Sequence, residues 1–139
     1  MGDMALERLY LRPESFYTEH EIDLRLGTSV QSIDTKSQTV DLGTEVLAYD
    51  DLVLTTGSVP NRLPAAIGGM LQGVHVVRDL ADVDAMSPRF TEGARVLIVG
   101  GGYIGLEAAA VASKLGLNVT LVEMSERILQ RVAATETSD

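Results

Sequence analysis

A run of glycines between an aliphatic stretch and an alanine-rich stretch constrains the fold of this chain more than any other feature. Gly100, Gly102 and Gly105 fit the pattern G-x-G-x-x-G. The run follows residues 95–99, which have the aliphatic character of a buried strand, and it opens a segment of good helix formers at residues 103–115. Strand, glycine turn and helix in this order predict the start of a parallel, right-handed βαβ unit.

Each glycine of the pattern has a physical task in such a turn. Gly100 permits the tight exit from the strand, the missing side chain of Gly102 lets a pyrophosphate approach the backbone, and Gly105 lets helix and strand pack closely. The pyrophosphate then lies at the helix N-terminus, where free N–H groups and the helix dipole favour negative charge. The predicted cofactor-binding residues of the turn are Gly100, Gly101, Gly102, Tyr103, Ile104 and Gly105. A glycine turn with a purely structural role is the alternative.

An acidic residue closes the next predicted strand, residues 119–122. Glu123 follows the turn at about the 20-residue spacing that is typical of dinucleotide-binding units. A carboxylate there accepts hydrogen bonds from the adenosine ribose and repels a 2′-phosphate, which favours NAD over NADP. Arg127 lies nearby, and arginine is the residue that NADP sites use. A solvated arginine on a following helix, predicted at residues 125–132, is the simpler interpretation.

Two residues of the predicted helix are candidates for a catalytic role. Glu107 either stabilises the positive end of the helix or lies beside a nicotinamide ring. Tyr103 either packs against its neighbours or covers a cofactor ring. The two histidines, His20 and His75, are far apart in the sequence and lack ligand patterns, so we predict no metal site.

The first half of the chain predicts short elements. Ser15 is expected to cap a helix that runs through His20. Alternation of apolar and charged residues predicts a strand at residues 22–26. Residues 30–42 predict a hairpin with a polar turn at residues 35–38, and residues 52–56 a buried strand.

A second group of elements is expected between this region and the glycine turn. Residues 74–77 predict a strand. Asp79 and Asp82 resemble a capping box and open a helix that Pro88 ends. Gly116 is placed to end the helix that follows the glycine turn.

Charge and composition exclude several classes of protein. The formal net charge of −9 argues against a general binder of nucleic acid or of anionic membranes. The absence of Cys excludes a disulfide scaffold, a thiolate metal site and a redox cysteine within these residues. No apolar stretch approaches the roughly 20 residues that span a bilayer. The start lacks the layout of a signal peptide, so a cytoplasmic location is expected.

Three motifs in the same order resemble the flavin-dependent, NADH-using ferredoxin and rubredoxin reductases, members of the FAD/NAD-linked reductase superfamily. They are residues 9–17 (LYLRPESFY), residues 49–57 (YDDLVLTTG) and residues 99–107 (VGGGYIGLE). Two departures from the family pattern occur. Thr55 stands where the family usually has Ala, and Asn61-Arg62 replaces the usual Pro-Arg order after Pro60.

The resemblance implies hydride transfer from NADH to FAD, followed by single-electron delivery to a ferredoxin-type iron–sulfur protein. It places the glycines on the NAD pyrophosphate and Glu123 on the adenosine ribose, with Tyr103 and Glu107 near the nicotinamide. Thr56 and Gly57 would approach the FAD. The alternatives are an NADH oxidase, a disulfide-reductase-type flavoenzyme and a non-catalytic NAD-binding module.

The family's first FAD pyrophosphate motif, its later Gly-Asp FAD motif and its C-terminal domain have no counterpart in this chain. We therefore expect an internal fragment of the α/β class. Residues 1–60 would be a hairpin-containing remnant of an FAD-binding domain, and residues 61–139 an incomplete Rossmann-type βαβ unit with parallel strands. Such a piece alone is not expected to bind FAD, and its exposed edges predict loose packing or self-association. A basic docking face for an acidic ferredoxin is expected outside these residues.

Overall fold

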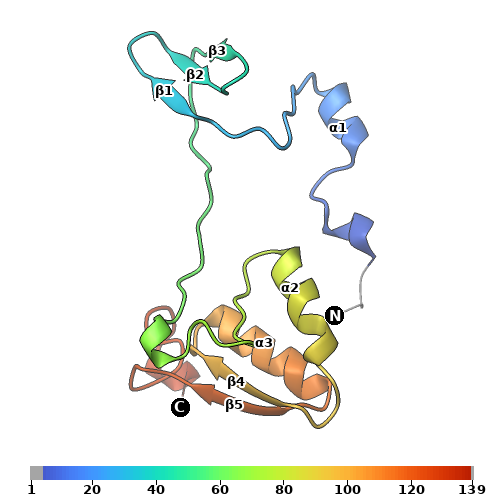
Figure 1. The fold of residues 1–139 in the computed structure, drawn as a ribbon, viewed down its shortest axis with the longest axis vertical. Helices are drawn as coiled ribbons and strands as arrows, with labels where there is room; N and C mark the ends of the chain where they lie inside the picture. The colour runs from blue at the N-terminus through green and yellow to red at the C-terminus, as the bar shows by residue number, and fades with distance from the viewer. Residues whose placement is uncertain (1–4, 139) are drawn as a thin grey trace. The chain divides into compact units, whose positions relative to one another are not determined.

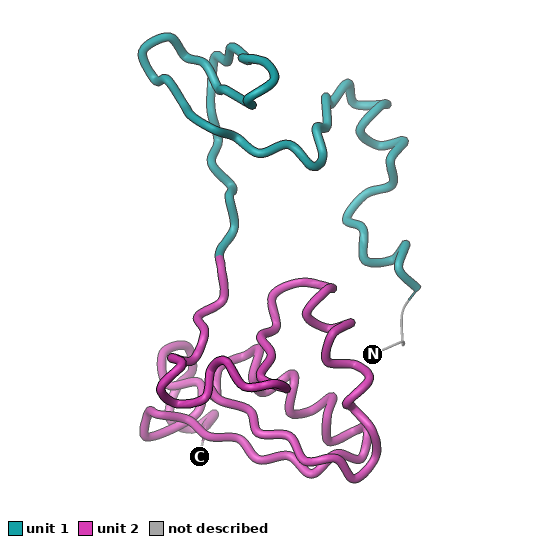
Figure 2. The backbone as a smooth tube through the Cα atoms, in the orientation of Figure 1, with its two compact units in different colours: residues 1–58 teal, residues 59–139 magenta. Residues whose placement is uncertain are grey.

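The chain divides into two compact units. The computed structural model describes residues 5–138. Residues 1–4 of the predicted first domain and residue 139 of the predicted second domain lie outside the described residues. The units comprise residues 1–58 and residues 59–139 (Figure 2). The first unit contains an antiparallel sheet and the second a parallel sheet.

The sheet of the first unit is a three-stranded meander (Figure 1). A 3₁₀ helix and a short α-helix come before it, η1 (Leu6–Leu9) and α1 (Glu14–Glu19). The strands, in spatial order, are β1 (Ser32–Asp34), β2 (Thr39–Asp41) and β3 (Val46–Ala48). The predicted hairpin is confirmed, whereas β3 was not predicted.

The turn of this hairpin is held by Asp34. Its carboxylate accepts hydrogen bonds from the backbone N–H of Lys36 at 2.8 Å and from the hydroxyl of Ser37 at 2.6 Å. These bonds lower the pKa of Asp34, with the Ser37 hydroxyl as the largest cause. A side chain that caps its own turn in this way fixes the register of the two strands.

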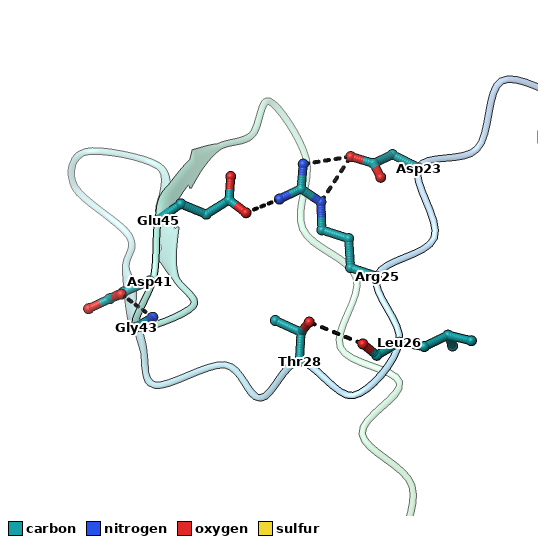
Figure 3. A network of polar contacts seen from close by, with 7 residues as sticks. All are labelled: Asp23, Arg25, Leu26, Thr28, Asp41, Gly43 and Glu45. Carbon is teal, nitrogen blue, oxygen red and sulfur yellow. Dashed lines mark hydrogen bonds and ion pairs between the residues drawn. The ribbon is translucent and has the colours of Figure 1, made fainter.

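Arg25 joins the segment before the sheet to the sheet itself (Figure 3). Its guanidinium donates to the Asp23 carboxylate at 2.7 and 2.9 Å and forms an ion pair with Glu45, which lies just before β3. The predicted strand at residues 22–26 is wrong, because these residues form turn and coil and Leu26 is 80% exposed. A strand requires a hydrogen-bonded neighbour, and no other part of residues 5–138 pairs with this segment.

Two more predicted strands, at residues 52–56 and 74–77, are also wrong. Both segments are irregular. Val53 and Leu54 have relative exposures of 79% and 65%, so the apolar run is not buried. A strand of a parallel sheet is buried only when neighbours and helices cover it, and the described residues supply neither for these runs.

The second unit is built around the predicted βαβ unit, which is confirmed (Figure 1). Its parts are β4 (Arg95–Val99), α3 (Tyr103–Lys114) and β5 (Asn118–Val122). The two strands are parallel, with Val99 opposite Val122. Helix α3 packs against both strands, and Ala112 on this helix is completely buried. The expected C′ residue Gly116 has a φ of +80°, the left-handed conformation that ends a helix.

The outer face of this sheet remains open in the described residues. Leu97 and Val99 of β4 and Val122 of β5 are all more than two-fifths exposed. They alternate with the half-buried residues that face α3. An apolar sheet face of this kind is normally covered in α/β proteins.

The capping box is confirmed at the start of α2 (Leu80–Met86). The Asp79 carboxylate accepts the Asp82 N–H at 3.0 Å, and the Asp82 carboxylate accepts the Asp79 N–H at 3.3 Å. The helix passes into a 3₁₀ turn, η3 (Ser87–Arg89), at the predicted end near Pro88.

The predicted cap at Ser15 is wrong, because α1 begins at Glu14 behind Pro13, which has no capping side chain. Two more 3₁₀ turns are η2 (Ala65–Ile67) and η4 (Thr135–Thr137).

Residues 125–132 form turns rather than the predicted helix. The backbone of Leu129 has a φ of +53°, a left-handed conformation that interrupts any α-helix. The N–H of Leu129 donates to the carbonyl of Gly101 at 2.9 Å instead of to a carbonyl of its own segment. A long-range bond has therefore replaced the helical one.

Candidate functional site

The glycine turn connects the end of β4 to the start of α3. The Gly100 N–H donates to the Val122 carbonyl at 2.8 Å, which extends the pairing of the two strands by one residue. The φ of Gly100 is +114°, a conformation that favours glycine. Gly102 is the N-cap residue of α3, and no side chain caps this helix. The first N–H groups of α3 therefore lack the partner that a capping side chain would supply.

The three glycines of the pattern have different surroundings. A Cβ on Gly105 would lie 2.0 Å from the Gly100 carbonyl oxygen, so this glycine is required for packing. A Cβ on Gly102 would meet no heavy atom within 4 Å. The space before Gly102 is therefore open, and a ligand can approach the backbone at the N-terminus of α3. These surroundings fit the pyrophosphate of a dinucleotide.

Gly101, between the first two glycines of the pattern, is buried and held by the segment that follows β5. Its N–H donates to Oε2 of Glu123 at 2.6 Å, and its carbonyl accepts the N–H of Leu129. A Cβ on Gly101 would lie 2.8 Å from Cγ2 of Ile128. Sequence reasoning missed these contacts, because the helix predicted for residues 125–132 would not have produced them.

Glu123 stands at the carboxyl end of β5, beside the turn, as predicted. One carboxylate oxygen accepts the Gly101 N–H, and the other accepts the Ser125 N–H at 2.8 Å. The Ser125 N–H, followed by the Gly101 N–H, lowers the pKa of Glu123 to about 2. Hydrogen bonds to a carboxylate stabilise its charged form, so Glu123 is ionised at neutral pH.

The other predicted residues of the turn lie on the first turns of α3. Tyr103 and Ile104 are 60% and 61% exposed, and Glu107 is also exposed. Tyr103 and Glu107 are four residues apart on the helix, so they share one face. Their predicted role beside a nicotinamide stays a prediction.

Arg127 is engaged by the backbone around it. Its guanidinium donates to the carbonyls of Ala133 at 3.0 Å and Gln130 at 3.2 Å and to the Ser138 hydroxyl at 2.8 Å. The interpretation as a solvated arginine on a helix is therefore wrong. The guanidinium holds the C-terminal turns together.

Thr56 and Gly57, predicted to approach FAD, are exposed in an irregular segment. Gly57 has a φ of +72°. Their predicted place beside FAD stays a prediction. Among residues 5–138, no cluster of three or more His, Asp or Glu side chains is arranged to hold a metal ion. His20 donates from Nδ1 to the Phe16 carbonyl at 2.8 Å and stacks on the Phe16 ring.

A comparison with protein families matches residues 4–139 to the pyridine nucleotide-disulphide oxidoreductase family. The chain belongs to this family. Membership confirms the resemblance to the FAD/NAD-linked reductases that the sequence motifs indicated, and the family is one of enzymes. The observed α/β architecture agrees with it.

Two of the curated relatives are ferredoxin reductases by name. The ferredoxin–NAD(P)(+) reductase of Sphingomonas sp is 43% identical over 133 residues, which are 95% of this chain and 32% of the relative. The 5,5'-dehydrodivanillate O-demethylase ferredoxin reductase subunit of Sphingobium sp. is 44% identical over 99% of this chain and 33% of its own length. The chain therefore spans about a third of the length of these relatives.

Solved structures show the same likeness. The reductase in a covalent putidaredoxin reductase–putidaredoxin complex superposes with a TM-score of 0.85 and 38% identity, over 98% of this chain and 33% of that one. An engineered water-forming NADPH oxidase bound to NADPH gives a TM-score of 0.80 and 26% identity, over 98% of this chain and 31% of that one. The fold of these residues is thus that of the family's reductases.

Proposed function

We propose that the chain is part of a flavoprotein oxidoreductase that passes a hydride from NADH to FAD and then single electrons to a ferredoxin-type iron–sulfur protein. One observation carries the proposal. The uncapped start of α3, with open space before Gly102, occurs in a chain 43% identical to a ferredoxin–NAD(P)(+) reductase. A relative in complex with putidaredoxin supports an iron–sulfur protein as the electron acceptor.

The residues of the turn fit the nucleotide half of this proposal. The backbone N–H groups at the start of α3 bind the pyrophosphate, and no side chain obstructs the approach at Gly102. Glu123 accepts the adenosine ribose hydroxyls. Its carboxylate is held at the turn by the N–H groups of Gly101 and Ser125.

The proposal includes a preference for NADH over NADPH. The charged carboxylate of Glu123 repels a 2′-phosphate. Arg127, the arginine that the sequence places near this site, donates from both terminal nitrogens of its guanidinium to the carbonyls of residues 130 and 133. We expect Arg127→Ala to leave the ratio of the NADH and NADPH dissociation constants unchanged.

We assign the nicotinamide side of the site to two residues on one face of α3. Glu107 positions the nicotinamide carboxamide, whose N–H₂ group is a donor suited to a carboxylate. Tyr103 lies over the entrance to the nicotinamide site and excludes water. Ile104 adds an apolar contact, since its side chain is exposed beside Tyr103.

FAD enters the proposal through the family resemblance. It supplies the conversion of a two-electron hydride into two single electrons. Thr56 and Gly57 contribute part of its surroundings, and the remaining contacts come from outside the residues of this chain. The formal charge of −9 makes these residues a poor docking face for an acidic ferredoxin, so the docking face is also assigned elsewhere.

The remaining parts of the proposal concern location and association. Within residues 5–138, no helix has the length and apolar character needed to cross a bilayer. We place the protein in the cytoplasm, where NADH is available, with neither nucleic acid nor membrane as a partner. The open apolar face of β4 and β5 would let the 139-residue chain self-associate when it is isolated.

The test uses the protein expressed from its complete gene. We expect a flavin absorbance spectrum that NADH bleaches under anaerobic conditions, and cytochrome c reduction that depends on added ferredoxin. Gly102→Val fills the open space before the turn and should weaken NADH binding at least tenfold while the flavin is retained. A protein without flavin, or an unchanged NADH affinity in Gly102→Val, would contradict the proposal.

A second candidate is an NADH oxidase of the same family. It is favoured by the likeness to a water-forming NADPH oxidase. The same preparation separates the two functions. An oxidase consumes NADH and oxygen together at full rate without ferredoxin, whereas the proposed reductase does so only slowly.

A further inference from the structure

The segment that follows β5 holds the backbone of the glycine turn from both sides. We propose that this bracing segment, residues 123–129, sets the conformation of the turn before a nucleotide binds, and that Glu123 is a positioning residue which acts through Gly101. This role is additional to the ribose contact, and it rests on the proposed NADH site.

Both polar backbone groups of Gly101 are bound by the bracing segment. The N–H donates to Oε2 of Glu123 at 2.6 Å, and the carbonyl accepts the Leu129 N–H at 2.9 Å. Gly101 itself is buried, where an unpaired backbone group is costly. Two opposed hydrogen bonds leave the peptide planes on either side of Gly101 little freedom to rotate.

Packing of the bracing segment also restrains Gly101. A Cβ on Gly101 would lie 2.8 Å from Cγ2 of Ile128 and 3.3 Å from Cβ of Glu123. The bracing segment therefore lies directly on the Cα of Gly101. This position is the variable one in the G-x-G-x-x-G pattern, but here any side chain would require Ile128 to shift. By contrast, Gly102 faces open space.

The bracing segment is itself fixed. The second carboxylate oxygen of Glu123 accepts the Ser125 N–H, and Leu129 has a left-handed backbone with a φ of +53°. Arg127 bonds the carbonyls that follow the segment. Glu123 is also ionised at neutral pH, because the hydrogen bonds from Ser125 and Gly101 lower its pKa to about 2.

This arrangement separates the two roles of Glu123. The Gly101 N–H is already bound, so the N–H groups from Gly102 onward must bind the pyrophosphate. Loss of Glu123 would release the Gly101 peptide and misalign those groups. It would also remove a negative charge from the neighbourhood of an anion, which by itself strengthens phosphate binding. A loss of affinity for a ligand that cannot contact Glu123 would therefore report on the position of the turn.

The decisive probe is an NADH analogue with a 2′,3′-dideoxyadenosine half, which has no hydroxyl for Glu123 to accept. Calorimetric dissociation constants are measured for NADH and for this analogue, with the wild type, Glu123→Ala and Glu123→Gln of the complete protein. We expect Glu123→Ala to weaken binding of the analogue about tenfold, and Glu123→Gln to weaken it less, because one amide oxygen can still accept the Gly101 N–H. Analogue affinity equal to that of the wild type would overturn the proposal and leave only a ribose contact.

A matched control removes the same charge without touching Gly101. Glu126 is an exposed glutamate within the bracing segment, and no hydrogen bond to Gly101 involves it. Glu126→Ala should bind both ligands at least as tightly as the wild type. A loss in this variant equal to that in Glu123→Ala would also overturn the proposal, because the effect would then come from charge or from the segment in general.

Amide hydrogen exchange tests the bracing role without any nucleotide. The Gly101 amide should exchange slowly in the wild type and at least tenfold faster in Glu123→Ala, while the amide of Ala112, in the last turn of α3, keeps its rate. Equal exchange of Gly101 in both proteins would overturn the bracing role. A wild type that fails to bind NADH yet shows this change in exchange would instead contradict the proposed function alone.

Discussion

Gly105 lies against the backbone of Gly100 so closely that a Cβ on Gly105 would stand 2.0 Å from the Gly100 carbonyl oxygen. The contact joins the first turn of α3 to the end of β4. It shows that the last glycine of the pattern serves packing, while the open space before Gly102 is left for a ligand. Stability and binding are thus assigned to different glycines of one turn.

Gly105→Ala should lower the free energy of unfolding by about 1–3 kcal/mol, because α3 must move away from β4 to admit the methyl group. Urea denaturation followed by circular dichroism measures the change. Gly102→Ser is the control, since Gly102 has the extended backbone of an N-cap and serine is a favourable N-cap residue. We expect the control to be as stable as the wild type or more so, and equal losses in both variants would contradict this division of roles.

Asp79→Ala should destabilise the protein by about 1 kcal/mol, because the N–H of Asp82 loses its acceptor at the start of α2. Asp82→Ala removes the reciprocal bond and should have a smaller effect of the same sign. Asp84→Ala, an exposed aspartate on the same helix, removes the same charge without touching the cap and serves as the control. Thermal unfolding measures all three, and an effect of Asp84→Ala as large as that of Asp79→Ala would show that charge alone is responsible.

The stabilising effect of Glu123 should depend on pH. Its pKa is about 2 in the folded chain against an ordinary value of 4.5, so its contribution is fully present above pH 4.5 and is lost as the pH falls toward 2. The difference in unfolding free energy between the wild type and Glu123→Gln should therefore shrink over this range and stay constant between about pH 6 and pH 8. A difference that changes near neutrality would place the pKa of Glu123 elsewhere.

Ala112→Leu should destabilise the protein by about 1–3 kcal/mol, because the side chain of Ala112 on α3 is completely buried. Ala110→Leu, at an exposed position of the same helix, should change stability by less than about 0.5 kcal/mol. Chemical denaturation of both variants checks the pair. Similar losses would show that α3 does not pack on the strands through this face.

The elements that the sequence predicted correctly depend on contacts close along the chain. The capping box needs only Asp79 and Asp82, and the close fit of Gly105 against Gly100 involves only the helix and strand that flank the turn. The hairpin likewise depends on the local bonds of Asp34. Such features are stabilised by neighbours that the pattern itself contains.

The predictions that failed concern contacts with distant residues. The apolar patterns of residues 22–26, 52–56 and 74–77 predicted strands with buried side chains. No other described segment pairs with these residues, so the strands do not form. At residues 125–132 the helical pattern was overridden by bonds to Gly101, which lies more than 20 residues earlier. Periodicity cannot reveal this kind of competition, because the partner is not in the same window of sequence.

The close fit of Ile128 against Gly101 has a practical consequence for protein engineering. Transplanting the glycine loop into another scaffold would need the stretch after the second strand to be transferred with it. Conversely, a library that randomises Gly101 should co-vary Ile128 toward smaller side chains, since a side chain at Gly101 would meet Cγ2 of Ile128.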